Sequence, residues 1–367
     1  MSQDYCRGCG TVIQTVDPVA PGYVPETVLQ QKKQLICQRC YKINHYGEAG
    51  HIQPDHNQIR HNLQRAINNS ALAILVVDFS DLTGSFAVWQ NYLQKTPYIL
   101  AVNKIDLLPT RTKEEEVTDF LKEYINKLKL PQPIAIVSIS SLKGYGVESL
   151  TKKITALVPE KSKVALFGVT NVGKSSLVKR ILQTENVVNS PTVSKFPGTT
   201  LGLSNWSILD GRITLIDTPG LVPGDRMGDL LCPKCGSLLA ANRIEQKLWG
   251  IKPGKGIIIG GLGGVINRGD AEITLIAFTA ADVGTHRTDA VRVTELLEAQ
   301  PDWLKKVCLG CIQKIKWQTH EVQLDPNQDL AIAGLGWVSL RRERSKLQML
   351  IPEGIRWEIR AAVVGRK

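Results

Sequence analysis

The stretch that decides the fold reads KVALFGVTNVGKSSLVKRIL and spans residues 163–182. An apolar run, residues 163–167, leads directly into a glycine-rich turn and then into a helix-like segment. The turn matches the phosphate-binding pattern in full from Gly168 to Ser175, in the strand–turn–helix context that the pattern requires. Backbone N–H groups of such a turn converge on phosphate oxygens at a helix N-terminus. The stretch therefore predicts a nucleotide-binding P-loop.

Two side chains of this loop carry the predicted phosphate chemistry. Lys174 is expected to bridge the β- and γ-phosphates, and Ser175 is expected to bind Mg²⁺ through its hydroxyl. The rest of the loop is expected to hold phosphate mainly through its backbone. The loop residues assigned to nucleotide binding are Gly168, Asn171, Val172, Gly173, Lys174, Ser175 and Ser176.

A second apolar run ends in the motif DTPG at residues 217–220. Asp217 would hold Mg²⁺ through water, and the Gly220 amide would sense the γ-phosphate. Between this motif and the P-loop lies a polar stretch with two adjacent threonines. Thr200 is the predicted hydroxyl ligand that completes the Mg²⁺ shell, Thr199 is the alternative, and an ordinary turn is the competing interpretation.

Base identity is predicted from the motif NKID at residues 103–106, again at the end of an apolar run. The carboxylate of Asp106 can accept two hydrogen bonds from the N1–H and N2 amine of guanine, whereas adenine offers no such donor pair. Asn103 would tie the loop together, and Lys104 would lie along the base plane. After the next apolar run, the segment Ser140, Ser141 and Leu142 can supply a backbone amide to guanine O6.

The runs that carry these motifs alternate with helix-like stretches such as residues 114–130. Buried strands that alternate with helices predict an α/β fold with a doubly wound, mostly parallel sheet covered on both faces. We expect a metal module at 1–60, the nucleotide domain at 61–225, and a separate, partly β domain at 226–367. The expected strands are 71–79, 97–106, 133–140, 163–169, 203–209 and 212–218.

Eight cysteines form four Cys-x-x-Cys pairs, which favour metal binding over disulfides in a chain without a recognisable secretion signal. Two pairs in the first forty residues predict one tetrahedral Zn²⁺ site, with buried, unligated cysteines as the alternative; its ligands would be Cys6, Cys9, Cys37 and Cys40. The other two pairs could form a second zinc site inside the C-terminal domain, or remain without metal; they are Cys232, Cys235, Cys308 and Cys311.

The charge is strongly positive, with 45 lysines and arginines against 34 acids and a formal net charge of +11. From Arg341 to Lys367 the chain has eight basic residues against three acids. Such a tail suits contacts to a nucleic-acid backbone, and an ordinary solvated surface is the alternative. No apolar stretch is long enough to span a bilayer. We therefore expect a cytoplasmic, monomeric protein that does not bind membranes.

Together these motifs resemble the five signature elements of translation-factor-type GTPases, but the base-reading pair comes first. That order is similar to the circularly permuted GTPases and, with the zinc module in front, to the YqeH family. The resemblance runs from the first cysteine pair to the segment GLGWVSL at 334–340. It implies GTP and GDP as ligands, a GTP-hydrolysing switch, and a role in small ribosomal subunit assembly with ribosomal RNA or its particle as partner.

The same resemblance indicates slow hydrolysis. Leu221 occupies the position where small regulatory GTPases often place a water-orienting glutamine. Asn171 matches an asparagine that similar GTPases use to bind K⁺, although it could also be merely a residue compatible with the loop. The residues assigned to catalysis are Lys174, Thr200, Asp217, Gly220 and Asn171.

Permutation makes the DTPG motif the end of the nucleotide domain, so the segment after it leads directly into the C-terminal domain. We expect the GTP state to set the orientation of that domain through this joint. Two rival functions remain. One is an RNA-binding scaffold that uses GTP structurally with negligible turnover. The other is a nucleotide-using metabolic enzyme such as a kinase, for which the sequence offers no evident acceptor site.

Overall fold

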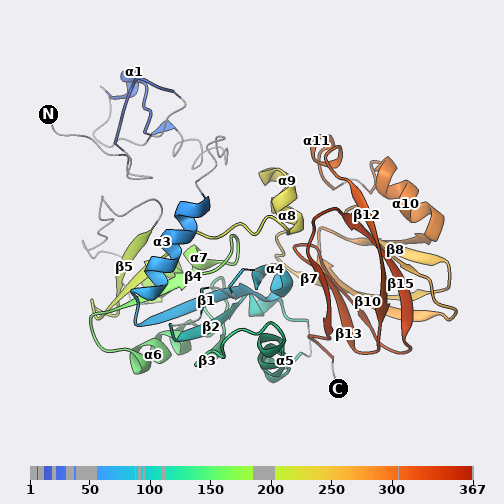
Figure 1. Ribbon diagram of the computed structural model, residues 1–367, viewed down its shortest axis with the longest axis horizontal. Coiled ribbons are helices and arrows are strands. Elements are labelled where there is room, and N and C mark those ends of the chain that lie inside the picture. Colours follow the sequence, from blue (N-terminus) through green and yellow to red (C-terminus); the bar gives the residue numbers. More distant parts are fainter. Residues whose placement is uncertain are drawn as a thin grey trace.

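A computed structural model describes most of the chain, and Figure 1 shows its arrangement. The described residues are 6, 12–18, 22–29, 37–38, 56–86, 88–89, 92–93, 96–109, 112–184, 203–304 and 306–365. The predicted site residues Cys9, Cys40, Thr199 and Thr200 lie outside them. A short helix, α1 (Glu26–Leu29), is described in the N-terminal part.

The nucleotide domain is built on a six-stranded sheet in the order β3-β2-β1-β4-β6-β5. Five strands are parallel, and β5 alone runs antiparallel to its neighbour β6. Every residue of β1 and β2 is buried, which explains why these central strands read as unbroken apolar runs. The strands are β1 (Leu72–Asp78), β2 (Tyr98–Asn103), β3 (Ala135–Ser138), β4 (Ser162–Phe167), β5 (Ser204–Ile208) and β6 (Ile213–Asp217). All six expected strands are confirmed.

Helices between these strands cover the sheet. In α5, an apolar face that includes Phe120 and Tyr124 is buried, and three glutamates in the first turn suit the positive end of the helix dipole. Helix α6 lies against α7, and α3 packs on β4. The helices are α3 (His56–Asn68), α4 (Leu82–Ser85), α5 (Glu114–Lys127), α6 (Val147–Leu157) and α7 (Lys174–Thr184), with 3-10 turns at η1 (Phe79–Asp81) and η2 (Ile105–Leu107).

The C-terminal domain consists of two five-stranded antiparallel sheets, β16-β13-β14-β10-β7 and β11-β8-β9-β15-β12. The glycines of the two GLG segments make tight turns, at Gly260 and Gly261 between β8 and β9 and at Gly334 before β14. Its strands are β7 (Ile244–Ile251), β8 (Lys255–Ile259), β9 (Gly263–Asn267), β10 (Ile273–Ala280), β11 (Thr285–Asp289), β12 (Trp317–Leu324), β13 (Gln328–Ile332), β14 (Gly336–Leu340), β15 (Ser345–Pro352) and β16 (Trp357–Ala361). Its helices are α8 (Met227–Leu230), α9 (Pro233–Ser237), α10 (Ala290–Ala299) and α11 (Leu309–Ile312).

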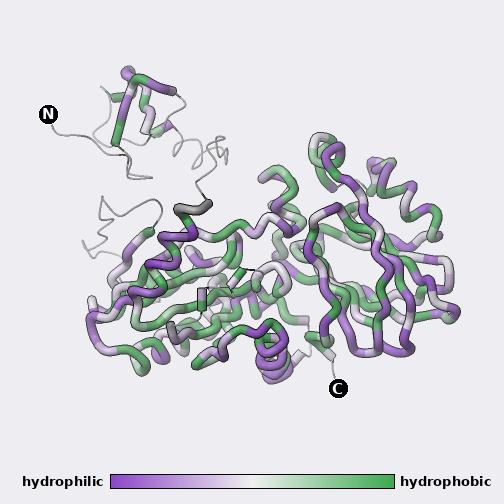
Figure 2. Tube along the Cα trace, viewed as in Figure 1, coloured by the Kyte–Doolittle hydropathy of each residue, from purple (hydrophilic) through white to green (hydrophobic). Residues whose placement is uncertain are grey.

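One hydrophobic core crosses from the nucleotide domain into the C-terminal domain. Ile276, Phe278 and Trp337 belong to the same buried cluster as the central strands of the parallel sheet. The Trp337 ring stacks on Phe278, with centroids 4.8 Å apart, and meets the edge of Phe79 at 6.2 Å. Figure 2 shows apolar segments concentrated in the strands of both domains. The two domains are therefore docked through packed apolar surface.

Polar contacts fix the same interface. Glu358 on β16 accepts a hydrogen bond from Thr83 Oγ1 at 2.9 Å and another from the Tyr124 hydroxyl. The buried Arg360 donates to Thr83 Oγ1 at 3.0 Å. Asp81 accepts from the Gly334 amide at 3.0 Å, and burial raises the pKa of this carboxyl. These bonds orient one domain relative to the other.

Candidate functional site: the carboxyl edge of the parallel sheet

All the described motif loops follow parallel strands at one edge of the sheet. The P-loop follows β4, Asp217 ends β6, Asn103 ends β2, and Ser140 lies just beyond β3. Carboxyl ends of parallel strands meet at the same edge, which is where ligands bind in open α/β sheets. The reordered sequence therefore still brings its phosphate and base motifs together.

The P-loop is shaped by two residues with left-handed backbones. Gly173 has φ +93°, and a Cβ there would lie 2.2 Å from Nδ2 of Asn103, so only glycine fits. Asn171 has φ 68°, a conformation that asparagine tolerates better than most residues, and its side chain is exposed. Helix α7 begins at Lys174, so the loop amides lie at a helix N-terminus.

The buried Lys174 folds back over its own loop. Its Nζ donates to the carbonyls of Gly168 at 3.0 Å and Val169 at 2.9 Å. Burial lowers the pKa of Lys174 to about 8, opposed by the carboxylate of Asp217 and reinforced by the guanidinium of Arg226. A Cβ on Gly220 would lie 2.8 Å from this Nζ and 2.9 Å from Thr170, so the DTPG backbone can approach the P-loop only because residue 220 is glycine.

Asp217 is the polar group in this edge that is least satisfied. Its Oδ1 is buried and has no hydrogen-bond partner among the described residues, while the Ser175 hydroxyl bonds to the carboxyl group. Burial raises the pKa of Asp217 to about 6, against the opposing effect of Lys174. An orphaned carboxylate oxygen beside a serine hydroxyl suits a hard divalent cation such as Mg²⁺. The residues present therefore fit the predicted metal.

Asn103 connects the base loops to the P-loop. Its Oδ1 accepts hydrogen bonds from the backbone N of Ser141 at 2.9 Å and from the Ser141 hydroxyl at 3.0 Å. Its Nδ2 donates to the Val172 carbonyl at 2.7 Å. The side chain is buried, so each of these bonds counts toward the loop geometry.

The other base-loop residues lie at the same edge and differ in exposure. Lys104 has a left-handed backbone and pairs with Asp78, which ends the neighbouring strand β1 in register with Asn103. Asp106 is exposed. Ser140 is buried and accepts from the Lys143 amide at 3.0 Å, whereas Leu142 is exposed.

Two arginines that the sequence interpretation missed hold this edge. Arg180 on α7 donates from Nε to the Ser141 carbonyl at 3.1 Å and also bonds the Leu142 carbonyl, so it fixes the loop after β3. The buried Arg226 donates to the Thr170 carbonyl at 2.9 Å and to its hydroxyl at 2.6 Å. It also forms a two-armed ion pair with Asp229. No motif marks either arginine, because both act through backbone carbonyls distant in sequence.

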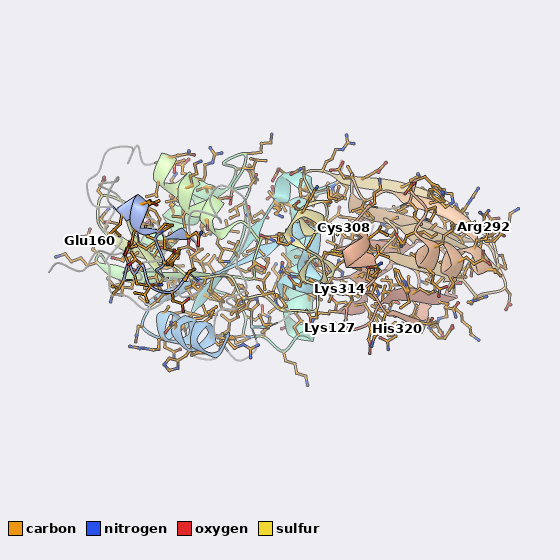
Figure 3. All side chains as sticks on the ribbon, turned by 90° about the horizontal axis from the view of Figure 1, so that it is seen from above. Lys127, Glu160, Arg292, Cys308, Lys314 and His320 are labelled. Carbon is orange, nitrogen blue, oxygen red and sulfur yellow. The ribbon has the colours of Figure 1, made fainter. Side chains whose placement is uncertain are left out.

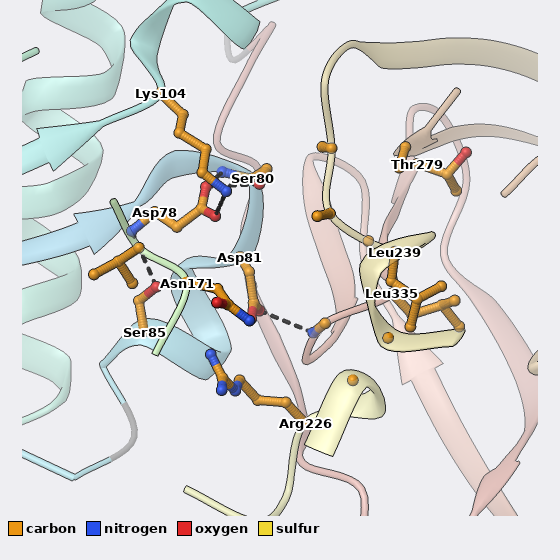
Figure 4. Close-up of a pocket in the computed structure, with 18 of the residues that line it drawn as sticks. Asp78, Ser80, Asp81, Ser85, Lys104, Asn171, Arg226, Leu239, Thr279 and Leu335 are labelled. Carbon is orange, nitrogen blue, oxygen red and sulfur yellow. Dashed lines mark hydrogen bonds and ion pairs between the residues drawn. The ribbon is translucent and has the colours of Figure 1, made fainter. Parts of the chain in front are cut away.

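A cavity of about 360 Å³ lies beside these loops, between the two domains. Figure 4 shows Lys104 and Asn171 on its nucleotide-domain side and Thr279 and Leu335 on the facing side. Arg226 lies at its floor in this view. The P-loop and the base loop thus border on the C-terminal domain.

The position after the DTPG motif is built into the core. Leu221 is buried in the hydrophobic cluster, and its carbonyl accepts from the Thr170 amide at 2.8 Å. Its backbone also forms a parallel bridge with Val169. A leucine in this setting cannot orient a water molecule.

The two cysteine sets are placed to different extents. Of the first set, Cys6 and Cys37 are buried together, and the Cys37 amide donates to Cys6 Sγ at 3.1 Å. Their predicted partners lie outside the described residues. The second set is brought together completely: the Sγ atoms of Cys232, Cys235, Cys308 and Cys311 all lie within 4.8 Å of one another. We call these four residues the second cysteine cluster.

Within this cluster the thiols differ in acidity. The amide of Cys235 and the neighbouring thiols lower the pKa of Cys232 to about 7, and the amide of Cys311 lowers that of Cys308. Burial raises the pKa of Cys235 and of Cys311. The two inner thiols therefore resist ionisation with no cation between them.

Much of the charge in the predicted basic tail is already paired. Arg356 bonds Asp225, Arg344 pairs with Asp325, and Arg360 is buried in the domain interface. Arg341 donates to the carbonyls of Val364 and Gly365. Arg366 and Lys367 lie outside the described residues. Several positive charges of the tail therefore stabilise the fold, so fewer of them are available to attract a nucleic acid at the surface.

Family models match three parts of the chain. Residues 41–160 match the elongation factor Tu GTP-binding domain, and residues 163–246 match the 50S ribosome-binding GTPase model. Residues 272–363 match the YqeH-like C-terminal model. The two GTPase models follow one another along the chain, with the base-reading half first.

Similar proteins cover this chain to different extents. The uncharacterised protein YqeH of Bacillus subtilis is 27% identical, over 99% of this chain and 100% of that protein. The chloroplastic/mitochondrial NO-associated protein 1 of Arabidopsis thaliana is 26% identical, over 91% of this chain and 69% of its own length. Among solved structures, YjeQ from Thermotoga maritima is 24% identical with a TM-score of 0.29, over 41% of this chain and 48% of that chain.

The motif order, the strand order and the match along the whole length of YqeH agree with one another. In the part of the chain that the structure describes, no helix has the length and apolar character needed to cross a membrane. The chain is a GTPase whose motifs stand in circularly permuted order, and it is similar to YqeH along the whole length of both proteins.

Proposed function

We propose that this GTPase is a molecular switch that acts in assembly of the small ribosomal subunit. In this proposal residues 1–60 form a zinc module, 61–225 bind GTP, and 226–367 contact RNA or ribonucleoprotein. The observation that carries the GTP site is Asn103, whose three hydrogen bonds join the base loop to the P-loop. Such a bond network suits a ligand that spans both loops.

Each predicted residue takes one role in this site. Asp106 would accept the guanine donors, with Lys104 along the base and the loop from Ser140 to Leu142 facing O6. Lys174 would leave its own carbonyls for the β- and γ-phosphates, and Gly220 would offer its amide to the γ-phosphate. Ser175, Asp217 and Thr200 would hold Mg²⁺, which neutralises charge on the phosphate oxygens when bound.

Hydrolysis without a partner is expected to be slow, because Leu221 is buried and offers no polar group to water. In this proposal a K⁺ ion near Asn171 accelerates hydrolysis. The left-handed backbone at this position would by itself also explain why the residue is an asparagine. Replacing Asn171 with Gly separates the two interpretations, since glycine keeps the backbone conformation and removes the amide. We expect this variant to bind GTP and to lose stimulation by KCl over NaCl. Equal rates in both salts for the unchanged protein would reject the potassium role.

A ribosomal partner is supported by the 50S ribosome-binding GTPase model over residues 163–246 and by the positive net charge. The choice of the small subunit rests on the resemblance to the YqeH family, whereas the name of that model points to the large subunit. The test is co-sedimentation of the full chain with purified small and large ribosomal subunits, in GDP and in a GTP analogue. We expect binding to the small subunit that depends on the nucleotide. Turnover measured with the same particles separates the switch from the scaffold, whose hydrolysis would stay negligible throughout. A cytoplasmic location and a monomeric state stay predictions.

A further inference from the structure

The second cysteine cluster consists of two copies of one local structure. Cys232 precedes α9 with φ −63° and ψ 157°, and Cys308 precedes α11 with φ −69° and ψ 157°. In each copy the carbonyl of the first cysteine accepts an amide of the helix, from Gly236 at 2.8 Å and from Ile312 at 3.1 Å. Two equivalent Cys-x-x-Cys turns thus face each other, as Figure 1 shows for α9 and α11.

The two turns exchange hydrogen bonds through their sulfurs. The Cys232 amide donates to Cys311 Sγ at 3.2 Å, and the Cys308 amide donates to Cys235 Sγ at 3.2 Å. N–H donors directed at sulfur stabilise the thiolate, which is the form that binds metal. A disulfide would close two sulfurs to about 2.05 Å. Four sulfurs around Zn²⁺, each about 2.3 Å from the ion, would lie about 3.8 Å apart, which is compatible with the mutual limit of 4.8 Å.

Burial and ligand type favour zinc over other ions. Cys235 and Cys311 are buried, Cys232 is half-buried and Cys308 is exposed, so the cluster lies between the protein interior and the surface. Figure 3 shows Cys308 close to the middle of the molecule, on the part of the C-terminal domain nearest the nucleotide domain. Four thiolates with no open position are the usual donor set of a structural Zn²⁺ site.

The second cysteine cluster lies close in sequence to the proposed γ-phosphate sensor, Gly220. Cys232 is separated from Gly220 only by residues 221–231. This segment is bonded to the P-loop through Arg226 and Thr170, and the Met227 amide donates to the Ala333 carbonyl at 2.8 Å. One end of the segment is therefore the proposed γ-phosphate sensor, and the other end is a cysteine turn docked on α11.

We propose that Cys232, Cys235, Cys308 and Cys311 bind a structural Zn²⁺ ion that fastens the carboxyl end of segment 221–231 to α11 of the C-terminal domain. Fastening that end means that movement after Gly220 is passed to the C-terminal domain and is not absorbed by the joint. The mechanical part rests on the proposed switch, whereas zinc binding does not.

The first test counts metal in the full chain purified without chelator. Elemental analysis is expected to give two zinc ions per chain in the unchanged protein and one after the first site is removed by C6S with C9S. Cys308→Ser, at the exposed position, should remove the second ion, whereas Cys308→His should retain it because imidazole is also a zinc ligand. Ser237→Ala, an exposed change next to the cluster, is the matched control and should leave the count unchanged.

Three results would overturn the proposal. They are retention of one zinc by C308S in the background lacking the first site, iron with its visible absorption in place of zinc, and thiol titration that finds these four cysteines oxidised. If Cys308→Ser does not fold, the count in the C6S/C9S background together with Cys308→His still decides the matter.

The mechanical consequence is measured by hydrogen exchange at residues 221–236 with GDP and with a GTP analogue. In the unchanged protein we expect the analogue to alter exchange in the strands of the C-terminal domain as well as in this segment. In Cys308→Ser, exchange of the segment should rise at least tenfold and the change in the C-terminal strands should disappear, with GTP affinity unchanged. A C-terminal response that persists without zinc refutes the fastening. Absence of GTP binding in the unchanged protein would instead refute the proposed function and leave the zinc site standing.

Discussion

The base half and the phosphate half of the nucleotide site differ in how well their polar groups are satisfied. In the base half, the Asn103 side chain makes three hydrogen bonds, one to the Val172 carbonyl and two with the amide and hydroxyl of Ser141. In the phosphate half, Lys174 donates to carbonyls of its own loop, and Asp217 Oδ1 lacks a partner among the described residues. Burial displaces the pKa values of this lysine and this aspartate toward neutrality.

This difference indicates a division of labour. The loops of the base half are already joined by Asn103, so the proposed recognition of guanine would cost little in ordering. The phosphate half holds two buried ionisable groups whose charged forms are disfavoured until opposite charge is supplied. Nucleotide binding should therefore change the structure mainly in the phosphate half and in segment 221–231, which is joined to the P-loop through Arg226.

The largest expected effect is loss of the buried cation in the phosphate half. We expect Lys174→Ala to weaken GTP binding about 100- to 5,000-fold, because removing the lysine from a desolvated pair with the nucleotide phosphates costs about 3–5 kcal/mol. Fluorescent-nucleotide titration measures it. Lys179→Ala removes the same charge from an exposed site on the same helix and is the control. If Lys174→Ala weakens GTP binding less than tenfold, the phosphate half does not depend on its buried lysine, and the contrast with the base half is wrong.

A change of specificity comes next and concerns the base half alone. Asp106→Asn should favour xanthosine triphosphate over guanosine triphosphate by about 100-fold or more. The asparagine amide presents a donor where the carboxylate presented an acceptor, so one donor of guanine loses its partner. Competition titrations with both nucleotides check this. Asp119→Asn, at an exposed helix position, should change neither affinity. Unchanged GTP affinity in Asp106→Asn would remove Asp106 from the site.

A smaller effect is expected where the halves meet. Asn103→Ala leaves the Val172 carbonyl and the Ser141 amide without their partner, so unfolding free energy should fall by about 2–3 kcal/mol. GTP affinity should fall about tenfold, since both loops lose their common support. Chemical denaturation and nucleotide titration are the measurements. The exposed Asn126→Ala is the comparison variant, and equal behaviour of the two would show that the halves are independent.

The smallest effect is a pH dependence of binding. The pKa of Lys174 is about 8 in the free protein, and bound phosphate should raise it, so affinity should fall as pH rises above 8. Asp217 has a pKa of about 6 and must be a carboxylate to hold metal, so affinity should also fall as pH drops below 6. Each limb should approach about tenfold per pH unit, the slope for one proton. Asp217→Asn should flatten the acid limb and move the basic limb to lower pH, because the Asp217 carboxylate supports the charged form of Lys174.

The sequence predicted the parallel sheet well because its central strands are fully buried and read as unbroken apolar runs. The motif loops were also predictable, since each follows a strand and glycine or asparagine marks the required backbone. Arg180 and Arg226 were not, because they bond carbonyls that only the fold brings near. Arg360 was misassigned to a basic surface: composition counts a charge but does not tell whether it points outward or into an interface. The zinc-module residues Cys9 and Cys40 and the hydroxyl of Thr200 stay predictions.

The shared hydrophobic core also has a consequence for how this architecture can be rearranged by recombination. Because Phe278 and Trp337 complete the packing over Phe79, the C-terminal domain is not a detachable accessory that could be exchanged for that of a distant relative. A chimera joined within residues 221–231 would expose apolar surface on both sides of the seam unless these aromatic residues were transplanted together. Diversification of such proteins should therefore proceed by additions at loops away from this seam.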